Sequence, residues 1–170
     1  IIIFGCLIYS QNIQYFDGEL AYTYLKKQCD FGPRYPGSVG HANTIKYFTQ
    51  FFEPMDAKLM VMKESIIHPY EAPDSLRLTN FLVRFNENAQ RRIMLMAHWD
   101  TRKIADLDLD SLNHNTPIIG ANDGASGVAI LMVIAEMLNV MPLINLGIDI
   151  LLVDGEDVGH AGDAHNFGIG

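Results

Sequence analysis

Two short apolar runs, residues 93–97 (IMLMA) and 146–153 (LGIDILLV), constrain the fold of this chain most strongly. Each has the length of a buried strand, and residues 124–138 between them repeat apolar side chains at helical spacing. A strand, a helix and a second strand form a βαβ unit, whose right-handed crossover makes the strands parallel and neighbouring. We therefore expect an α/β fold in which residues 93–97 form a central strand covered on both faces.

Capping residues and breakers predict the elements upstream of this unit. Asp17 is placed to cap a helix that continues to Cys29, and Ser38 is placed to cap a second helix that Pro54 ends. Alternating apolar residues then predict two strands, over residues 57–67 and 76–85.

Composition limits the class of protein. A chain of 170 residues that is 49% apolar can bury one core, which predicts a single globular domain. The net charge is −8, and the twelve Lys and Arg residues are scattered. Nucleic acid is therefore excluded as a partner, because phosphate binding requires clustered basic side chains.

The first nine residues are apolar but fall well short of the roughly 20 that a membrane-spanning helix requires. They are typical of the end of a signal peptide, and Cys6 lies in a sequence similar to a lipoprotein cleavage box. The alternative is a buried first strand or helix. We expect residues 1–16 to be a signal or lipoprotein remnant on an exported, periplasmic or cell-envelope protein, with membrane anchoring through a lipidated Cys6, and residues 17–170 to belong to one domain.

Acidic and imidazole side chains follow the predicted strands, where open α/β sheets place their ligands. His98 and Asp100 end the first run, Asp123 precedes the helix, and Glu156 and Asp157 end the second run. Residues two apart on an extended chain point the same way, so His98 and Asp100 can share a site. Imidazole and carboxylate groups suit Zn²⁺, which in catalytic sites keeps one position open beside a general base.

Each of these groups also has a structural interpretation. A histidine at a strand end commonly bonds to a loop carbonyl, Asp123 alone would be a helix N-cap, and Glu-Asp after a strand is usually a solvated turn. The coincidence of all three at the carboxyl ends of predicted elements favours a functional site.

Five sequence blocks resemble the zinc-dependent M28 peptidase family, and most closely its bacterial glutaminyl-peptide cyclotransferase branch. The blocks are residues 31–38 (FGPRYPGS), 97–102 (AHWDTR), 113–117 (NHNTP), 120–128 (GANDGASGV) and 154–157 (DGED). The resemblance extends from about Asp17 to Gly170. It implies a three-layer α/β/α fold of the zinc-exopeptidase kind, with a central mixed, largely parallel sheet of which the C-terminal part is missing.

The resemblance also implies roles for individual residues. Asp123 would be a zinc ligand, Asp157 the second acidic ligand and Glu156 the general base and acid. Cyclases of the family bind one zinc ion, in which case His98 and Asp100 are second-shell or structural residues. Aminopeptidases of the family bind two, in which case His98 is a ligand and Asp123 bridges the ions.

The sequence departs from the branch in two places. Lys103 and Ile104 stand where a proline and an aromatic residue are usual, which questions the local loop shape. The last histidine ligand of the family lies well beyond position 170, and His160 and His165 are too close to Asp157 to replace it. We therefore expect this chain to be the N-terminal part of a longer fold.

Three functions remain open at this point. The first is cyclisation of the N-terminal glutamine of peptides to pyroglutamate with release of ammonia, and the second is hydrolysis of the first peptide bond by a metallo-aminopeptidase. The third is an inactive fragment or a non-catalytic binding domain. For either reaction the expected substrate is a peptide or protein N-terminus and the expected state is a monomer.

Overall fold

The computed structural model describes residues 15–69, 71 and 73–159. Cys6, His160 and His165 lie outside these residues. The described chain forms the elements α1 (Gly18–Asp30), α2 (Val39–Phe52), β1 (Lys58–Ile67), β2 (Ser75–Phe85), β3 (Arg92–His98), the short helices η1 (Ser111–Asn113) and η2 (Ala121–Ala125), α3 (Ser126–Val140) and β4 (Gly147–Val153).

The first two helices begin at the predicted caps. The Asp17 side chain accepts a hydrogen bond from the Leu20 N–H at 2.9 Å, and the Ser38 hydroxyl accepts one from the His41 N–H at 3.0 Å. Each bond satisfies a main-chain donor that the first turn of a helix leaves without a partner. Both helices therefore start at the residues that the sequence predicts.

The four strands form one mixed sheet in the order β1-β2-β4-β3. β3 and β4 are parallel, as the βαβ pattern predicts, whereas β1 pairs with β2 and β2 with β4 in antiparallel fashion. A mixed sheet is confirmed, but the described strands are not largely parallel. The inner strands are β2 and β4, and β3 lies at the edge of the described sheet, because β4 is its one neighbour there.

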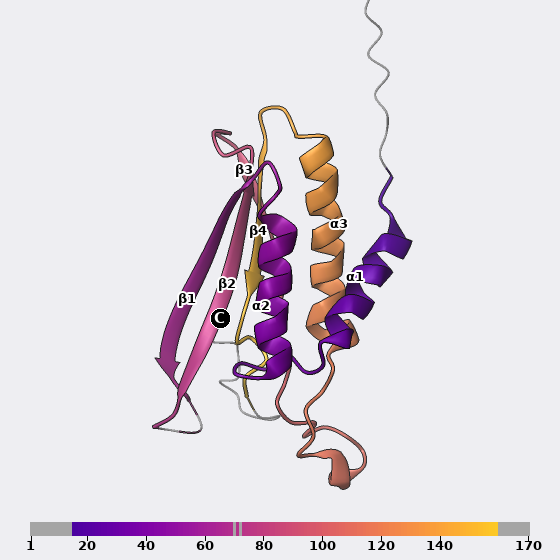
Figure 1. Cartoon of the computed structure of the whole chain (residues 1–170), viewed down its shortest axis with the longest axis vertical. Helices are drawn as coiled ribbons and strands as arrows, with labels where there is room; N and C mark the ends of the chain where they lie inside the picture. The colour runs from indigo at the N-terminus through magenta and orange to yellow at the C-terminus, as the bar shows by residue number, and fades with distance from the viewer. Residues whose placement is uncertain (1–14, 70, 72, 160–170) are drawn as a thin grey trace, which may run out of the picture.

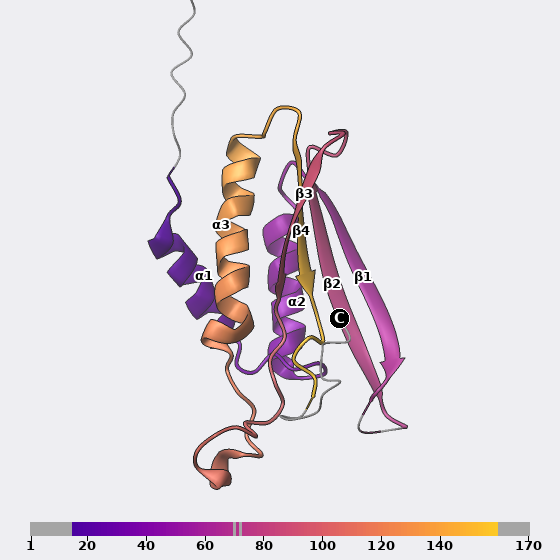
Figure 2. The same ribbon diagram turned by 180° about the vertical axis from the view of Figure 1, so that it is seen from behind.

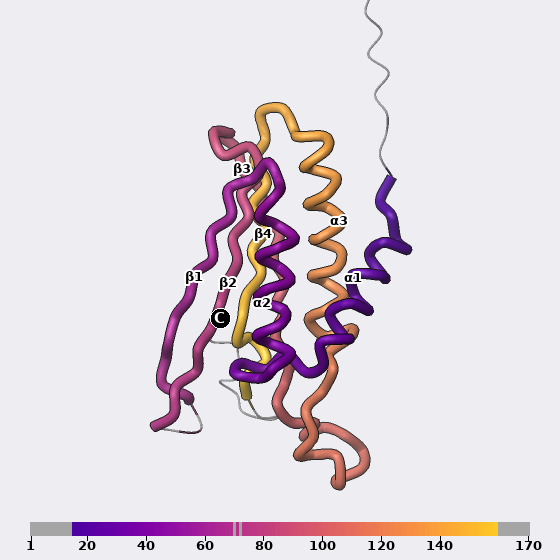
Figure 3. Tube along the Cα trace, viewed as in Figure 1, coloured from indigo at the N-terminus to yellow at the C-terminus, as the bar shows by residue number. Residues whose placement is uncertain are grey.

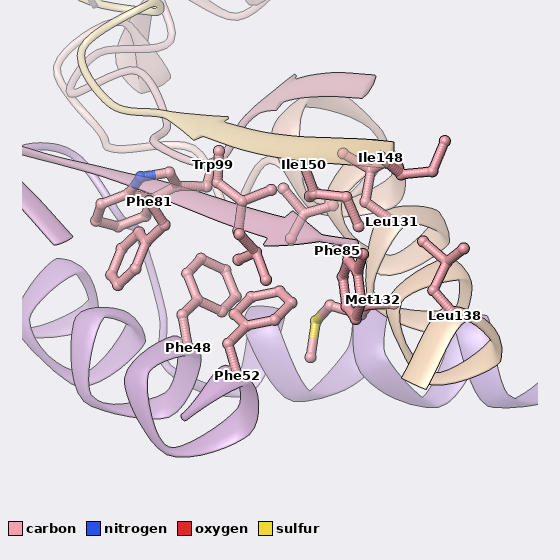
Figure 4. Close-up of a cluster of buried hydrophobic side chains, with 14 residues drawn as sticks. Phe48, Phe52, Phe81, Phe85, Trp99, Leu131, Met132, Leu138, Ile148 and Ile150 are labelled. Atoms are coloured by element: carbon pink, nitrogen blue, oxygen red, sulfur yellow. The ribbon is translucent and has the colours of Figure 1, made fainter. Parts of the chain in front are cut away.

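The α-helices α1, α2 and α3 of the described chain lie on one side of the sheet (Figures 1 and 2). The core lies between them and the sheet, where Phe48 and Phe52 of α2 meet Phe81 of β2 and Trp99 (Figure 4). The segment Ala121–Val140 has the length and composition of a membrane span, but seven α3 side chains are buried, five of them in this core. α3 is therefore the core helix of an α/β layer.

The opposite face of the sheet carries exposed side chains. Met94 and Met96 are 56% and 64% exposed, and strand register places both on the face away from Leu95, which packs in the core. The expectation that residues 93–97 are covered on both faces is therefore wrong for the described residues, which form two of the three expected layers.

Parallel pairing brings the carboxyl ends of β3 and β4 to the same edge, with His98 opposite Val153. The long segment after β3 and the start of α3 lie at this same end of the sheet (Figure 3). The residues that follow both strands are therefore held close together, and the predicted site residues are among them.

Asp149 of β4 provides a stability prediction at the opposite end of the sheet. Its carboxylate accepts hydrogen bonds from Arg92 at 2.7 and 2.9 Å and from Arg84 at 3.0 Å, which hold the pKa of Asp149 below its usual value. This stabilisation is present above the unfolded-state pKa and is lost as pH falls through the folded-state pKa. We expect Asp149→Asn to lower the free energy of unfolding in urea at pH 7 by about 1–2 kcal/mol.

The difference between wild type and Asp149→Asn should shrink as the medium is acidified toward about pH 3. Asp56→Asn is the matched control, because Asp56 is an exposed aspartate outside the strands. A difference that stays constant over this pH range would show that the ion pairs do not stabilise the fold.

Candidate active site

The strand-end histidine and the aspartate before α3 meet directly. His98 Nε2 lies 3.0 Å from Asp123 Oδ1, although 25 residues separate them. Asp123 has extended backbone angles and Gly124 a φ of +88°, which is accessible to glycine, and α3 begins only at Ser126. The helix N-cap interpretation of Asp123 is therefore wrong, since its side chain points to His98 and α3 has no side-chain cap.

Asp100 holds the loop after β4. Its side chain is fully buried, and its two oxygens accept hydrogen bonds from the main-chain N–H groups of Glu156 at 3.2 Å and Asp157 at 3.0 Å. A buried carboxylate requires such donors, because desolvation without them is costly. Asp100 therefore fixes the position of the Glu156–Asp157 backbone beside β3.

Carboxylates surround the imidazole of His98. Its Nδ1 lies 3.6 Å from Asp100 Oδ1 and 3.7 Å from Glu156 Oε2. The interaction with Asp100, together with the negative charges of Glu156 and Asp123, raises the pKa of His98 to about 9 against the opposing effect of burial. An imidazolium at this position neutralises part of the acidic cluster, and a metal bound through His98 would have to displace its proton.

Asp157 has two different oxygens. One accepts a hydrogen bond from Arg102 Nε at 2.9 Å, and the other is buried with no hydrogen-bond partner in the described part of the chain. Burial raises the pKa of Asp157, although Arg102 acts in the opposite direction. The unpartnered oxygen is suited to receive a cation.

Glu156 is the most accessible acid of the cluster after Asp123. Its side chain is 51% exposed, compared with 65% for Asp123. The carboxylate is thus anchored through its main chain by Asp100 while its side chain faces solvent. This arrangement allows proton exchange with a bound molecule.

All five predicted site residues are therefore brought to one edge of the sheet, and two further residues join them. Arg102 binds Asp157, and the buried Arg34 bonds to the carbonyls of loops on both sides of the site. No local sequence pattern indicated either contact, because the partners are 55 or more residues apart. The only available signal was their position inside conspicuous sequence blocks.

Lys103 and Ile104 are the two residues that differ from the family branch that the sequence resembles. Both line a pocket of about 200 Å³ next to Asp157. Lys103 Nζ lies 3.0 Å from Glu71 Oε1, and Ile104 lines the same pocket. Both side chains thus form part of the wall of a pocket beside the acidic cluster.

The donor chemistry of the cluster suits zinc only in part. An imidazole, several carboxylates and the unpartnered Asp157 oxygen are appropriate ligands. Nevertheless, across residues 15–159 as described, no three His, Cys, Asp or Glu side chains are arranged to hold a metal ion. A zinc ion bound here through Asp123 and Asp157 would therefore need a ligand from elsewhere.

The fold of the described residues is of the zinc-exopeptidase kind. The family model for peptidase family M28 matches residues 80–168, which is more than half of the chain. The chain belongs to peptidase family M28.

Solved structures agree with this assignment. A glutaminyl cyclase from Bacteroides thetaiotaomicron, bound to N-acetylhistamine, is 41% identical, with a TM-score of 0.82 over 89% of this chain and 51% of that one. A leucine aminopeptidase precursor from the same species is 42% identical, with a TM-score of 0.81 over 87% and 50%. A Zn-dependent exopeptidase from Parabacteroides distasonis is 31% identical, with a TM-score of 0.86 over 93% and 55%.

This chain thus spans about half the length of the solved structures that it matches. No curated protein sequence matches it.

Proposed function

We propose that the whole protein to which this sequence belongs is a zinc-dependent glutaminyl-peptide cyclotransferase. It converts the N-terminal glutamine of peptides to pyroglutamate and releases ammonia. The observation that carries this proposal is the convergence of His98, Asp123, Glu156 and Asp157 at one sheet edge. The similarity to bacterial glutaminyl cyclases supports it.

In this proposal Asp123 and Asp157 would hold one zinc ion, and a third ligand would come from outside the described residues. Zinc, when bound, supplies a Lewis acid that polarises the side-chain amide carbonyl of the glutamine. His98 stays hydrogen-bonded to Asp123 and orients its carboxylate, as outer-shell partners of metal ligands commonly do.

Glu156 moves the proton. Its carboxylate accepts a proton from the α-amine while that nitrogen bonds to the side-chain amide carbon of the glutamine. The same proton is then given to the amide nitrogen, the carbon–nitrogen bond breaks, and ammonia leaves. Asp100 keeps Glu156 in place through the main-chain hydrogen bond at 3.2 Å.

The alternative is a metallo-aminopeptidase, which the similarity to a leucine aminopeptidase precursor favours. The 3.0 Å contact between His98 and Asp123 is also compatible with a two-metal site in which both residues are ligands. In that reaction Glu156 would take a proton from a water molecule whose oxygen bonds to the carbonyl carbon of the first peptide bond, and would give that proton to the amide nitrogen as the carbon–nitrogen bond breaks. A non-catalytic binding domain is the third candidate and would give neither product.

We expect the full-length protein to release ammonia from a glutamine-initiated peptide and no free amino acid from a leucine-initiated one. Both peptides should share the same sequence after the first residue, so that only the first side chain differs. Ammonia is measured by a coupled enzymatic assay and free leucine by chromatography. Free leucine without ammonia would reject the cyclase in favour of the aminopeptidase, and neither product would favour the binding domain.

A further inference from the structure

Arg34 lies between α1 and α2 and is fully buried. Its guanidinium donates hydrogen bonds to main-chain carbonyls: Nε to Trp99 at 3.0 Å, Nη1 to Ile119 at 2.8 Å and Gln28 at 3.4 Å, and Nη2 to Gly120 at 2.9 Å. Burying a charge is costly unless several polar groups compensate for it. The three short bonds compensate for the burial of the guanidinium and also fix the positions of the three carbonyl groups.

The carbonyls of the three short bonds belong to two segments that flank the candidate site. Trp99 stands between His98 and Asp100, whereas Ile119 and Gly120 come shortly before Asp123. Arg34 also donates its own main-chain N–H to the Thr101 hydroxyl at 2.8 Å. One residue thus connects the loop after β3 to the loop before α3.

The two loops pack too closely at this point to tolerate a larger residue. Gly120 has a φ of +61°, and a Cβ there would clash with the Thr101 methyl group and lie 3.3 Å from Arg34 Nη2. Gly124 has the same constraint on the other side of Asp123, where a Cβ would lie 2.9 Å from the Asp100 carbonyl oxygen. The backbone on both sides of Asp123 is therefore fitted to the loop after β3.

We propose that Arg34 is a positioning residue for the zinc site: by bonding Trp99, Ile119 and Gly120 together, it sets the position of Asp123 relative to His98 and Asp100. This inference rests on the proposed zinc site. It assigns Arg34 no contact with substrate or metal. Its role requires a guanidinium, because the planar fork reaches three carbonyls at once and an ammonium group presents a single point of charge.

The test compares Arg34→Met and Arg34→Lys with Arg92→Met in the full-length protein. Arg92 is the matched control, because it also bonds to main-chain carbonyls, those of Phe85, Asn86 and Glu87, but at the opposite end of β3. Three quantities are measured for each variant: the zinc dissociation constant by competition with a chelator, the visible absorption spectrum of the Co²⁺ form, and the melting temperature without metal.

We expect Arg34→Met to weaken zinc binding by about 10- to 100-fold, the usual effect of removing an outer-shell support, and to change the Co²⁺ spectrum. Arg34→Lys should recover part of the affinity. Arg92→Met should lower the melting temperature and change neither metal property. An Arg34→Met protein that binds zinc within about twofold of wild type, with the wild-type Co²⁺ spectrum, would overturn the proposal.

If Arg34→Met does not fold, Arg34→Lys decides the question, since wild-type zinc affinity in that variant overturns the proposal as well. The result is separable from the proposed reaction. A wild-type protein that binds zinc but makes no pyroglutamate contradicts the reaction, whereas equal zinc affinity in wild type and variants contradicts only the role of Arg34.

Discussion

Replacing Glu156 by glutamine is expected to lower turnover of a glutamine-initiated peptide by about 10²- to 10⁴-fold, the usual contribution of a general acid–base group, while bound zinc is retained. Glutamine keeps the size of the side chain, and the main-chain bond to Asp100 does not depend on the side chain. The variant therefore loses the proton acceptor, together with the negative charge that Glu156 places near His98. Turnover is measured by ammonia release, and zinc by elemental analysis of the same sample.

Glu53→Gln provides the control for the loss of one exposed carboxylate, because Glu53 directly follows α2 and lies outside the cluster. Its turnover should equal that of the wild type. A Glu156→Gln protein without zinc would mean that Glu156 is a ligand and that another group carries the proton.

Replacing Asp123 by alanine is expected to remove both zinc and turnover. Removal of a direct ligand should weaken zinc binding by at least about 100-fold, since loss of an outer-shell partner already costs up to that amount. The Asp123 side chain is 65% exposed and does not cap α3, so the melting temperature of the metal-free protein should barely change. Zinc affinity and melting temperature are the two measurements.

Asp56→Ala is the matched control, because it removes an exposed aspartate far from the strand ends that carry the site. It should bind zinc with wild-type affinity. If Asp123→Ala also keeps its zinc, the metal is held without Asp123 and the proposed ligand set is wrong.

The local elements of the fold were predictable because their signals are local. Asp17 and Ser38 cap the helices that follow them, and the apolar run after Asn145 is β4. The order of the strands was not predictable from such signals, since β2 inserts next to β4 through pairing between distant residues. An uninterrupted apolar run such as that of β3 indicates a strand but does not indicate whether both of its faces are covered within this part of the chain.

The site was predictable to the extent that it depends on topology. The parallel strands β3 and β4 end at the same edge of the sheet, which brings His98 and the Glu156–Asp157 pair to that edge. The position of Asp123 depends instead on the positive φ of Gly124, which keeps Asp123 and Gly124 out of α3, so that the helix begins at Ser126. The support from Arg34 depends on contacts with residues about 65 and 86 positions away, for which no spacing rule exists.

The most direct test of the proposed active site measures zinc content and ammonia release together on wild type, Asp123→Ala and Glu156→Gln. The wild type should contain zinc and release ammonia, Asp123→Ala should do neither, and Glu156→Gln should contain zinc without releasing ammonia. Ammonia release at the wild-type rate by Asp123→Ala, or by wild-type protein stripped of zinc, would contradict a zinc-dependent site at this edge of the sheet.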